Sequence, residues 1–179
     1  AIIFSQTVGK EVHVIDFYQN NGQALEHYIQ YLDKKEYLYG VHHFPHDIKV
    51  TELMAGKSRY QVVTAFLDPR SEGKIDVIAD HSVIDGINVA RAFFQRCWFD
   101  EQRSEKLLDS LGSYSQEWDE RKGMFRDKPR HDWASDAADC FRYLSMGYRD
   151  KIDIRHKGVG MLKYGSRKAG QEFFKPVWQ

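Results

Sequence analysis

The sequence predicts an α/β fold in which β-strands alternate with amphipathic helices. Three observations predict this fold class. Two β-rich runs, which begin at Ala1 and at Glu11, surround a short glycine-containing turn at 7–10, as is typical of a hairpin. An aromatic-rich run at 37–44 stops at Pro45, which withdraws a backbone donor and ends regular strand pairing. A short apolar run at 75–79 predicts a further, buried strand.

Helices are predicted between and after these strands from apolar residues at helical spacing. Two helix starts carry capping residues, with Ser58 followed by Gln61 and Ser82 followed by Asp85. The predicted helices are a helix from Gln23 to about residue 35, one from Ser58, a long one from Ser82 through Cys97, a shorter helical pair from Leu107 through Trp118, and one from Trp133 to about Met146.

The composition predicts one domain over residues 1–179, because 42% hydrophobic residues in 179 are enough for one sizeable core. Lys and Arg (26) equal Asp and Glu (26), so overall charge gives no argument for a nucleic-acid or membrane partner. No apolar run approaches the roughly 20 residues that span a bilayer, and no leader pattern is visible, so we expect a soluble intracellular protein. Cys97 and Cys140 lack metal-ligand spacing and are expected to be reduced thiols.

Two acidic residues on the last predicted helix are candidates for a metal site. Asp136 and Asp139 are three residues apart and share one helix face, while Ala137 and Phe141 lie about 130° away. Such a pair requires a counter-charge, which a proton, a cationic side chain or a metal ion can supply. The alternative is a solvated first helical turn, where the helix dipole favours acids without any metal.

A third acid, Asp47, follows the predicted strand that ends at Pro45. Ligands in α/β sheets gather where strands end, so Asp47 and the helix acids can converge at one sheet edge. Carboxylate clusters select hard ions such as Mg²⁺ or Mn²⁺, and two such ions about 4 Å apart favour hydrolysis of a phosphodiester. His46 alternates to the opposite side of the strand and is interpreted as a supporting residue.

The tail beyond residue 149 is the one locally basic stretch, with eight Lys or Arg against three acids between residues 149 and 175. Such a run suits a phosphate backbone, and a solvated surface tail is the alternative interpretation.

The chain resembles the nuclease domain of the large terminase subunit of tailed bacteriophages. The resemblance rests on several uncommon short motifs, which occur in the same order along nearly the whole chain. They are residues 14–18 with 22–28, residues 45–48 with 56–59, residues 85–87, 97–100 and 117–119, and the stretch around Asp139. The resemblance implies a ribonuclease-H-like mixed β-sheet flanked by helices, and an Mg²⁺- or Mn²⁺-dependent endonuclease with two ions. It also implies that the enzyme cuts concatemeric double-stranded DNA in the bacterial host cytoplasm, with the terminase motor domain, the small terminase subunit and the portal as partners.

Carried over residue by residue, the resemblance makes Asp47 the second catalytic acid and Asp139 the acid of the C-terminal motif. Asp136 departs from the pattern, since many relatives have histidine there and more distant ones a metal-binding aspartate. The family's first catalytic aspartate precedes the match to Ala1, so the chain is expected to lack its first strand. Lys57 and Arg59 are expected to bind DNA. Two alternatives remain: a catalytically weak or inactive DNA- or portal-docking module, and a junction-resolving or transposition nuclease of the same fold.

Overall fold

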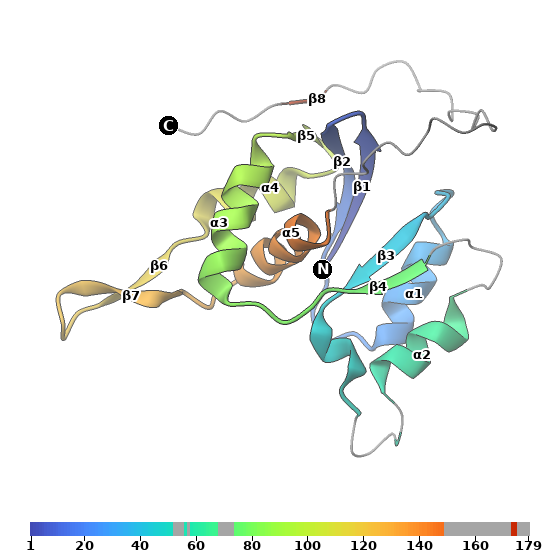
Figure 1. Ribbon diagram of the computed structural model, residues 1–179, viewed down its shortest axis with the longest axis horizontal. Helices are drawn as coiled ribbons and strands as arrows, with labels where there is room; N and C mark the ends of the chain where they lie inside the picture. The colour runs from blue at the N-terminus through green and yellow to red at the C-terminus, as the bar shows by residue number, and fades with distance from the viewer. Residues whose placement is uncertain (52–55, 57, 68–73, 149–172, 175–179) are drawn as a thin grey trace.

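The computed structural model describes residues 1–51, 56, 58–67, 74–148 and 173–174, which form a mixed α/β structure (Figure 1). The described strands make one four-stranded sheet and two two-stranded sheets. This arrangement agrees with the predicted α/β class. Among the described helices, none has both the length and the apolar character that a membrane span requires.

The four-stranded sheet is built on the predicted N-terminal hairpin. Strands β1 (Ile2–Val8) and β2 (Glu11–Tyr18) pair antiparallel, and Gly9 adopts a φ of 64° in the two-residue turn between them. Only glycine takes this conformation without a steric cost, which explains the position of the turn. Strand β5 (Cys97–Asp100) pairs parallel to β2, and β8 (Phe173–Phe174) pairs antiparallel to β5.

The second sheet consists of β3 (Val41–Phe44) and β4 (Lys74–Val77), which run parallel. The strand predicted over 37–44 therefore begins only at Val41. A 3₁₀ helix, η1 (His46–Lys49), follows Pro45 directly. Helices α1 (Leu25–Asp33) and α2 (Arg59–Phe66) accompany this sheet, and their buried residues Ile29 and Val63 pack with Ile48 of η1. The predicted capping box of Ser58 and Gln61 is present at the start of α2.

Three helices cover the larger sheet: α3 (Val83–Phe94), α4 (Glu105–Ser113) and α5 (Ser135–Gly147). Ser82 caps α3 as predicted, since its Oγ accepts a hydrogen bond from the backbone N–H of Asp85 at 3.1 Å. Helix α5 contacts both β1 and β3 and so joins the two sheets. The largest core cluster lies between these helices and the sheet and consists of Val12, Val14, Phe17, Phe93, Phe94, Cys97, Phe99, Leu107, Ala137 and Phe141.

Two predicted helical assignments are wrong. Cys97 begins strand β5 and is not the end of α3, because α3 stops at Phe94. A short apolar run fits a buried strand as well as a helix, and only the pairing with β2 decides between them. Trp118 lies on β6 (Gln116–Asp119), which forms an antiparallel hairpin with β7 (Met124–Pro129), and is not helical. Both cysteines are free thiols, as predicted.

Candidate functional site

Helix α5 carries two of the predicted site residues on its polar side. Ala137 and Phe141 are buried in the main core, whereas Asp136 is exposed and Asp139 is partly exposed. The two faces expected from the spacing of these residues are therefore present. The helix is held at the junction of the two sheets, since it contacts both β1 and β3.

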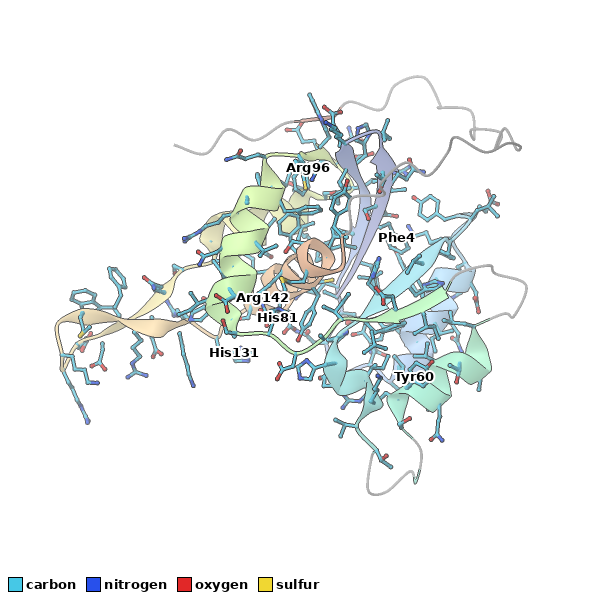
Figure 2. All side chains as sticks on the ribbon, viewed as in Figure 1. Phe4, Tyr60, His81, Arg96, His131 and Arg142 are labelled. Carbon is cyan, nitrogen blue, oxygen red and sulfur yellow. The ribbon has the colours of Figure 1, made fainter. Side chains whose placement is uncertain are left out.

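Asp139 is bound by a buried arginine on the same helix. Its Oδ1 accepts hydrogen bonds from Nε of Arg142 at 3.2 Å and from Nη2 at 3.0 Å. Arg142 is only 7% exposed, and its Nη1 lies 2.8 Å from Nε2 of His81, which precedes α3 (Figure 2). Charge-assisted bonds of this kind fix the orientation of a carboxylate.

The guanidinium occupies a closely fitted position between α3 and α5. A Cβ atom added at Gly86 of α3 would lie 2.6 Å from Cδ of Arg142, so glycine is the residue that leaves room for this side chain. The charge also lies 4.9 Å from the ring centroid of Tyr143, and His81 packs edge-on against the same ring at 5.1 Å. The position of Arg142 is therefore set by three neighbours.

Tyr143 is the residue on which acids from distant segments converge. Burial raises the pKa of Tyr143; the Arg142 charge opposes this rise, and the carboxylates of Asp47, Asp139 and Asp80 add to it. Asp47 belongs to η1, Asp80 follows β4, and Asp139 belongs to α5. The structure thus brings two predicted site residues, Asp47 and Asp139, to the surroundings of one tyrosine.

The sequence analysis did not identify four residues of this region, namely Asp80, His81, Arg142 and Tyr143. The hydroxyl of Tyr143 lies 3.3 Å from Nδ1 of His46, and Nε2 of His46 lies 3.6 Å from Oδ1 of Asp80. Asp80 follows β4 as His46 follows β3, and these strands are parallel. Because the carboxyl ends of parallel strands meet at one sheet edge, this placement was the signal that could have identified Asp80. Tyr143 offered no such signal.

Asp136 lies in a different environment from Asp139. It lines a polar hollow of about 440 Å³ at the start of α5, together with Lys106 and Asp109 of α4 and the residues His131, Asp132 and Trp133 that precede the helix. Burial raises the pKa of Tyr28 on α1, and the charges of Tyr18 and Asp136 add to this rise. Asp136 therefore faces α4 and the segment between β2 and α1, which contributes Gln19 and Asn21 to the hollow.

The donor atoms of Asp47 and Asp139 suit a hard divalent ion, because Mg²⁺ is commonly held by one or two carboxylates together with waters and substrate phosphates. Within the described ranges, however, no three His, Cys, Asp or Glu side chains come together closely enough to hold a metal ion. Asp47, Asp136 and Asp139 are thus not gathered into one complete site. Their roles as metal ligands stay a prediction.

The predicted DNA contacts are only partly covered by the structure. Arg59 is exposed at the first position of α2. Lys57 and the basic tail from residue 149 to 172 lie outside the described residues.

Comparisons of the chain with models of protein families, with curated proteins and with solved structures give no match. The positions of the side chains and the sequence resemblance therefore provide the grounds for a functional proposal.

Proposed function

We propose that this chain is a metal-dependent endonuclease domain of a viral DNA-packaging terminase, with a ribonuclease-H-like fold, that hydrolyses phosphodiester bonds of concatemeric double-stranded DNA. The observation that carries the proposal is the contact between η1 and α5: the hydroxyl of Tyr143, one helical turn after Asp139, lies 3.3 Å from Nδ1 of His46, the neighbour of Asp47. Both acids are those that the resemblance to the terminase family marks as catalytic. The partners by resemblance are the motor domain, the small subunit and the portal.

The fold supports this proposal at a coarser level. An antiparallel hairpin, β1–β2, and a parallel pair, β3–β4, flank a late helix that contacts both. Acids after a strand and on a late helix are the kind of residues that hold divalent ions for phosphodiester hydrolysis, and this supports the proposal.

Each site residue has a proposed role. Asp47 and Asp139 hold Mg²⁺ or Mn²⁺, and Arg142 keeps the carboxylate of Asp139 in place. Asp136, at the polar hollow, is a further ligand only if the helix and α1 adjust around the ion. Arg59 and Lys57 orient the DNA backbone. When bound, the two expected ions supply positive charge to the phosphodiester and to the oxygen that leaves.

A cleavage assay tests the proposal. Supercoiled plasmid incubated with the protein and Mn²⁺ or Mg²⁺ should be nicked or linearised, and EDTA should stop the reaction. Asp47→Asn and Asp139→Asn should each lower the rate by about 100-fold, because several kcal/mol of charge stabilisation are lost. Asp33→Asn, at the exposed end of α1, is the matched control. Cutting by Asp47→Asn at the unaltered rate, with its thermal unfolding unchanged, would contradict the role of Asp47.

The resemblance assigns one more catalytic acid to a strand that precedes the match to Ala1. A longer polypeptide that includes this strand is therefore the second sample in the assay. Greater activity of the longer polypeptide, lost again when its added acid is replaced by asparagine, would support the assignment.

A second candidate is a DNA- or portal-docking module without catalytic activity. Two observations favour it: no complete metal-ligand group is found in the part of the chain that the structure describes, and Arg142 neutralises Asp139. Crystals soaked in Mn²⁺ separate the two candidates. Density between Asp47 and Asp139 supports the nuclease. DNA binding without such density, and without cutting, supports the docking module.

A further inference from the structure

The β6–β7 hairpin projects from the body of the molecule as a two-stranded arm (Figure 1). At its base, the backbone N–H of Arg130 donates to the carbonyl oxygen of Ser115 at 2.9 Å. At its tip, Gly123 adopts a φ of 63°. An isolated two-stranded ribbon is marginally stable in water, so the pairing of β6 with β7 by itself contributes little stability.

The arm exposes aromatic side chains. Trp118 and Phe125 face each other across the two strands, with ring centroids 4.9 Å apart and an interplanar angle of 76°. They are 51% and 55% exposed, and the neighbouring Met124 is 55% exposed. Large apolar side chains gathered on a projecting ribbon indicate a contact surface.

Both acids of β6 are paired with one arginine of β7. Nη1 of Arg126 lies 3.1 Å from Oε2 of Glu117, and its Nε lies 3.3 Å from Oδ2 of Asp119. The other oxygen of Asp119 accepts hydrogen bonds from the backbone N–H groups of Arg121 at 3.1 Å and Lys122 at 3.3 Å. The tip is therefore ordered by backbone bonds that do not use the cationic side chains.

The two cations of the tip remain available. Arg121 and Lys122 are exposed, and among the side chains that the structure describes neither forms an ion pair. Glu120 is the one acid in the four-residue turn 120–123. The turn at the end of the arm thus holds two exposed cations and one acid, beside an exposed aromatic pair.

This combination fits DNA better than it fits a protein surface. Adjacent cations match the spaced phosphates of a duplex, and apolar side chains on a ribbon can enter a groove and pack against sugars and bases. The arm also leads directly into the start of α5, so a duplex held by it would lie next to the segment that carries Asp136 and Asp139.

We propose that the β6–β7 hairpin is a DNA-binding arm, in which Arg121 and Lys122 contact phosphates and Trp118 and Phe125 pack within a groove of the duplex. The choice of DNA rests on the proposed function. The arm's role concerns affinity alone and does not depend on cleavage.

The test measures binding without cutting. A fluorescent duplex of about 20–30 base pairs is titrated with the full chain in EDTA, at several salt concentrations, and anisotropy gives the dissociation constant. Removal of two phosphate contacts in Arg121→Ala/Lys122→Ala should reduce the slope of log affinity against log salt by about two. Trp118→Ser/Phe125→Ser should weaken binding by about fivefold or more with an unchanged slope.

The control removes the same amount of positive charge from another part of the surface. Lys10→Ala/Lys34→Ala removes two exposed cations away from the arm, in the β1–β2 turn and at the end of α1, and should keep the unaltered slope. Thermal unfolding of each variant establishes that the body is folded. The charge-reversed Arg121→Glu/Lys122→Glu is a second variant, which should weaken DNA binding more than the alanine variant does. Because the arm is peripheral, the body of the protein should tolerate this change.

Three results would overturn the proposal: no DNA binding by the unaltered chain, the same salt slope after Arg121→Ala/Lys122→Ala, or unaltered DNA affinity after Trp118→Ser/Phe125→Ser with a change only in self-association. The last result would assign the aromatic pair to a protein interface. DNA binding through the arm without any Mn²⁺-dependent cutting would overturn the proposed nuclease function and leave the arm established.

Discussion

Arg142 binds one oxygen of Asp139 twice, through Nε at 3.2 Å and Nη2 at 3.0 Å, and does so from a position that is 7% exposed. Both bonds go to Oδ1, so neither of them occupies Oδ2 of the carboxylate. The arginine therefore sets the direction in which Asp139 can present its second oxygen. This relationship links the stability of α5 to the proposed chemistry.

Arg142→Lys should impair both properties. A single ammonium cannot bind Asp139 and His81 with the geometry of a guanidinium, so we expect a loss of about 2 kcal/mol in the free energy of unfolding. Urea unfolding measures this loss, and the plasmid assay should show a lower rate of cutting. Arg91→Lys, at an exposed position on α3, provides the control. If Arg142→Lys has the unfolding midpoint and the rate of the unaltered chain, Arg142 does not position Asp139.

Gly86→Ala should destabilise the protein even though alanine is the better helix former. The new Cβ would lie 2.6 Å from Cδ of Arg142 and 2.9 Å from Cδ2 of His81, and overpacking typically costs about 1–3 kcal/mol. Gly112→Ala in α4 is the matched control, because nothing lies within 4 Å of its Cβ position. This second change should stabilise by up to about 1 kcal/mol. Thermal unfolding compares the two variants, and an equal gain in both would show that Arg142 can move away.

Two serines at helix starts should respond in opposite ways to replacement by alanine. Ser82 caps α3, so Ser82→Ala should cost about 1 kcal/mol of stability. Ser104 precedes α4, makes no capping bond, is fully buried and has an Oγ without a hydrogen-bond partner. Replacement of an unsatisfied buried hydroxyl by a methyl group should be neutral or stabilising. Chemical unfolding of both variants is the measurement, and a clear loss in Ser104→Ala would reveal an interaction of this hydroxyl.

His42 should make the protein sensitive to acid. Burial lowers the pKa of His42, and the neighbouring His43 adds to this shift. The folded state therefore binds a proton at His42 less readily than the unfolded state does. Above about pH 6.5, the pKa of histidine in the unfolded chain, His42 does not reduce the free energy of unfolding; as the pH falls below this value, the unfolded state takes up the proton and the free energy of unfolding decreases. The ring of Tyr39 packs 5.0 Å from that of His42, so His42→Phe keeps an aromatic contact. Unfolding free energies measured between pH 7.5 and 5 should fall less steeply in the variant; parallel curves would contradict this assignment.

The sequence determined the features that depend on neighbouring residues. Gly9 fixed the turn of the first hairpin, Ser58 and Ser82 fixed two helix starts, and the spacing in 135–147 fixed the polar and buried faces of α5. Each of these features needs only a few consecutive residues with the right backbone preference or hydrogen-bonding group. For this reason the sequence alone predicts them.

Tertiary structure decided the features that join distant segments. Cys97–Asp100 became a strand because β2 offered it a parallel partner, and Trp118 joined a hairpin because residues 124–129 paired with it. The contact between Arg142 and His81 depends on how the two sheets meet at α5. The same holds for the influence of the Asp47 and Asp80 carboxylates on the pKa of Tyr143. A local pattern states which side of an element is polar. The pattern does not predict which other element that polar side will contact, because the contact depends on how the whole chain packs its apolar surfaces.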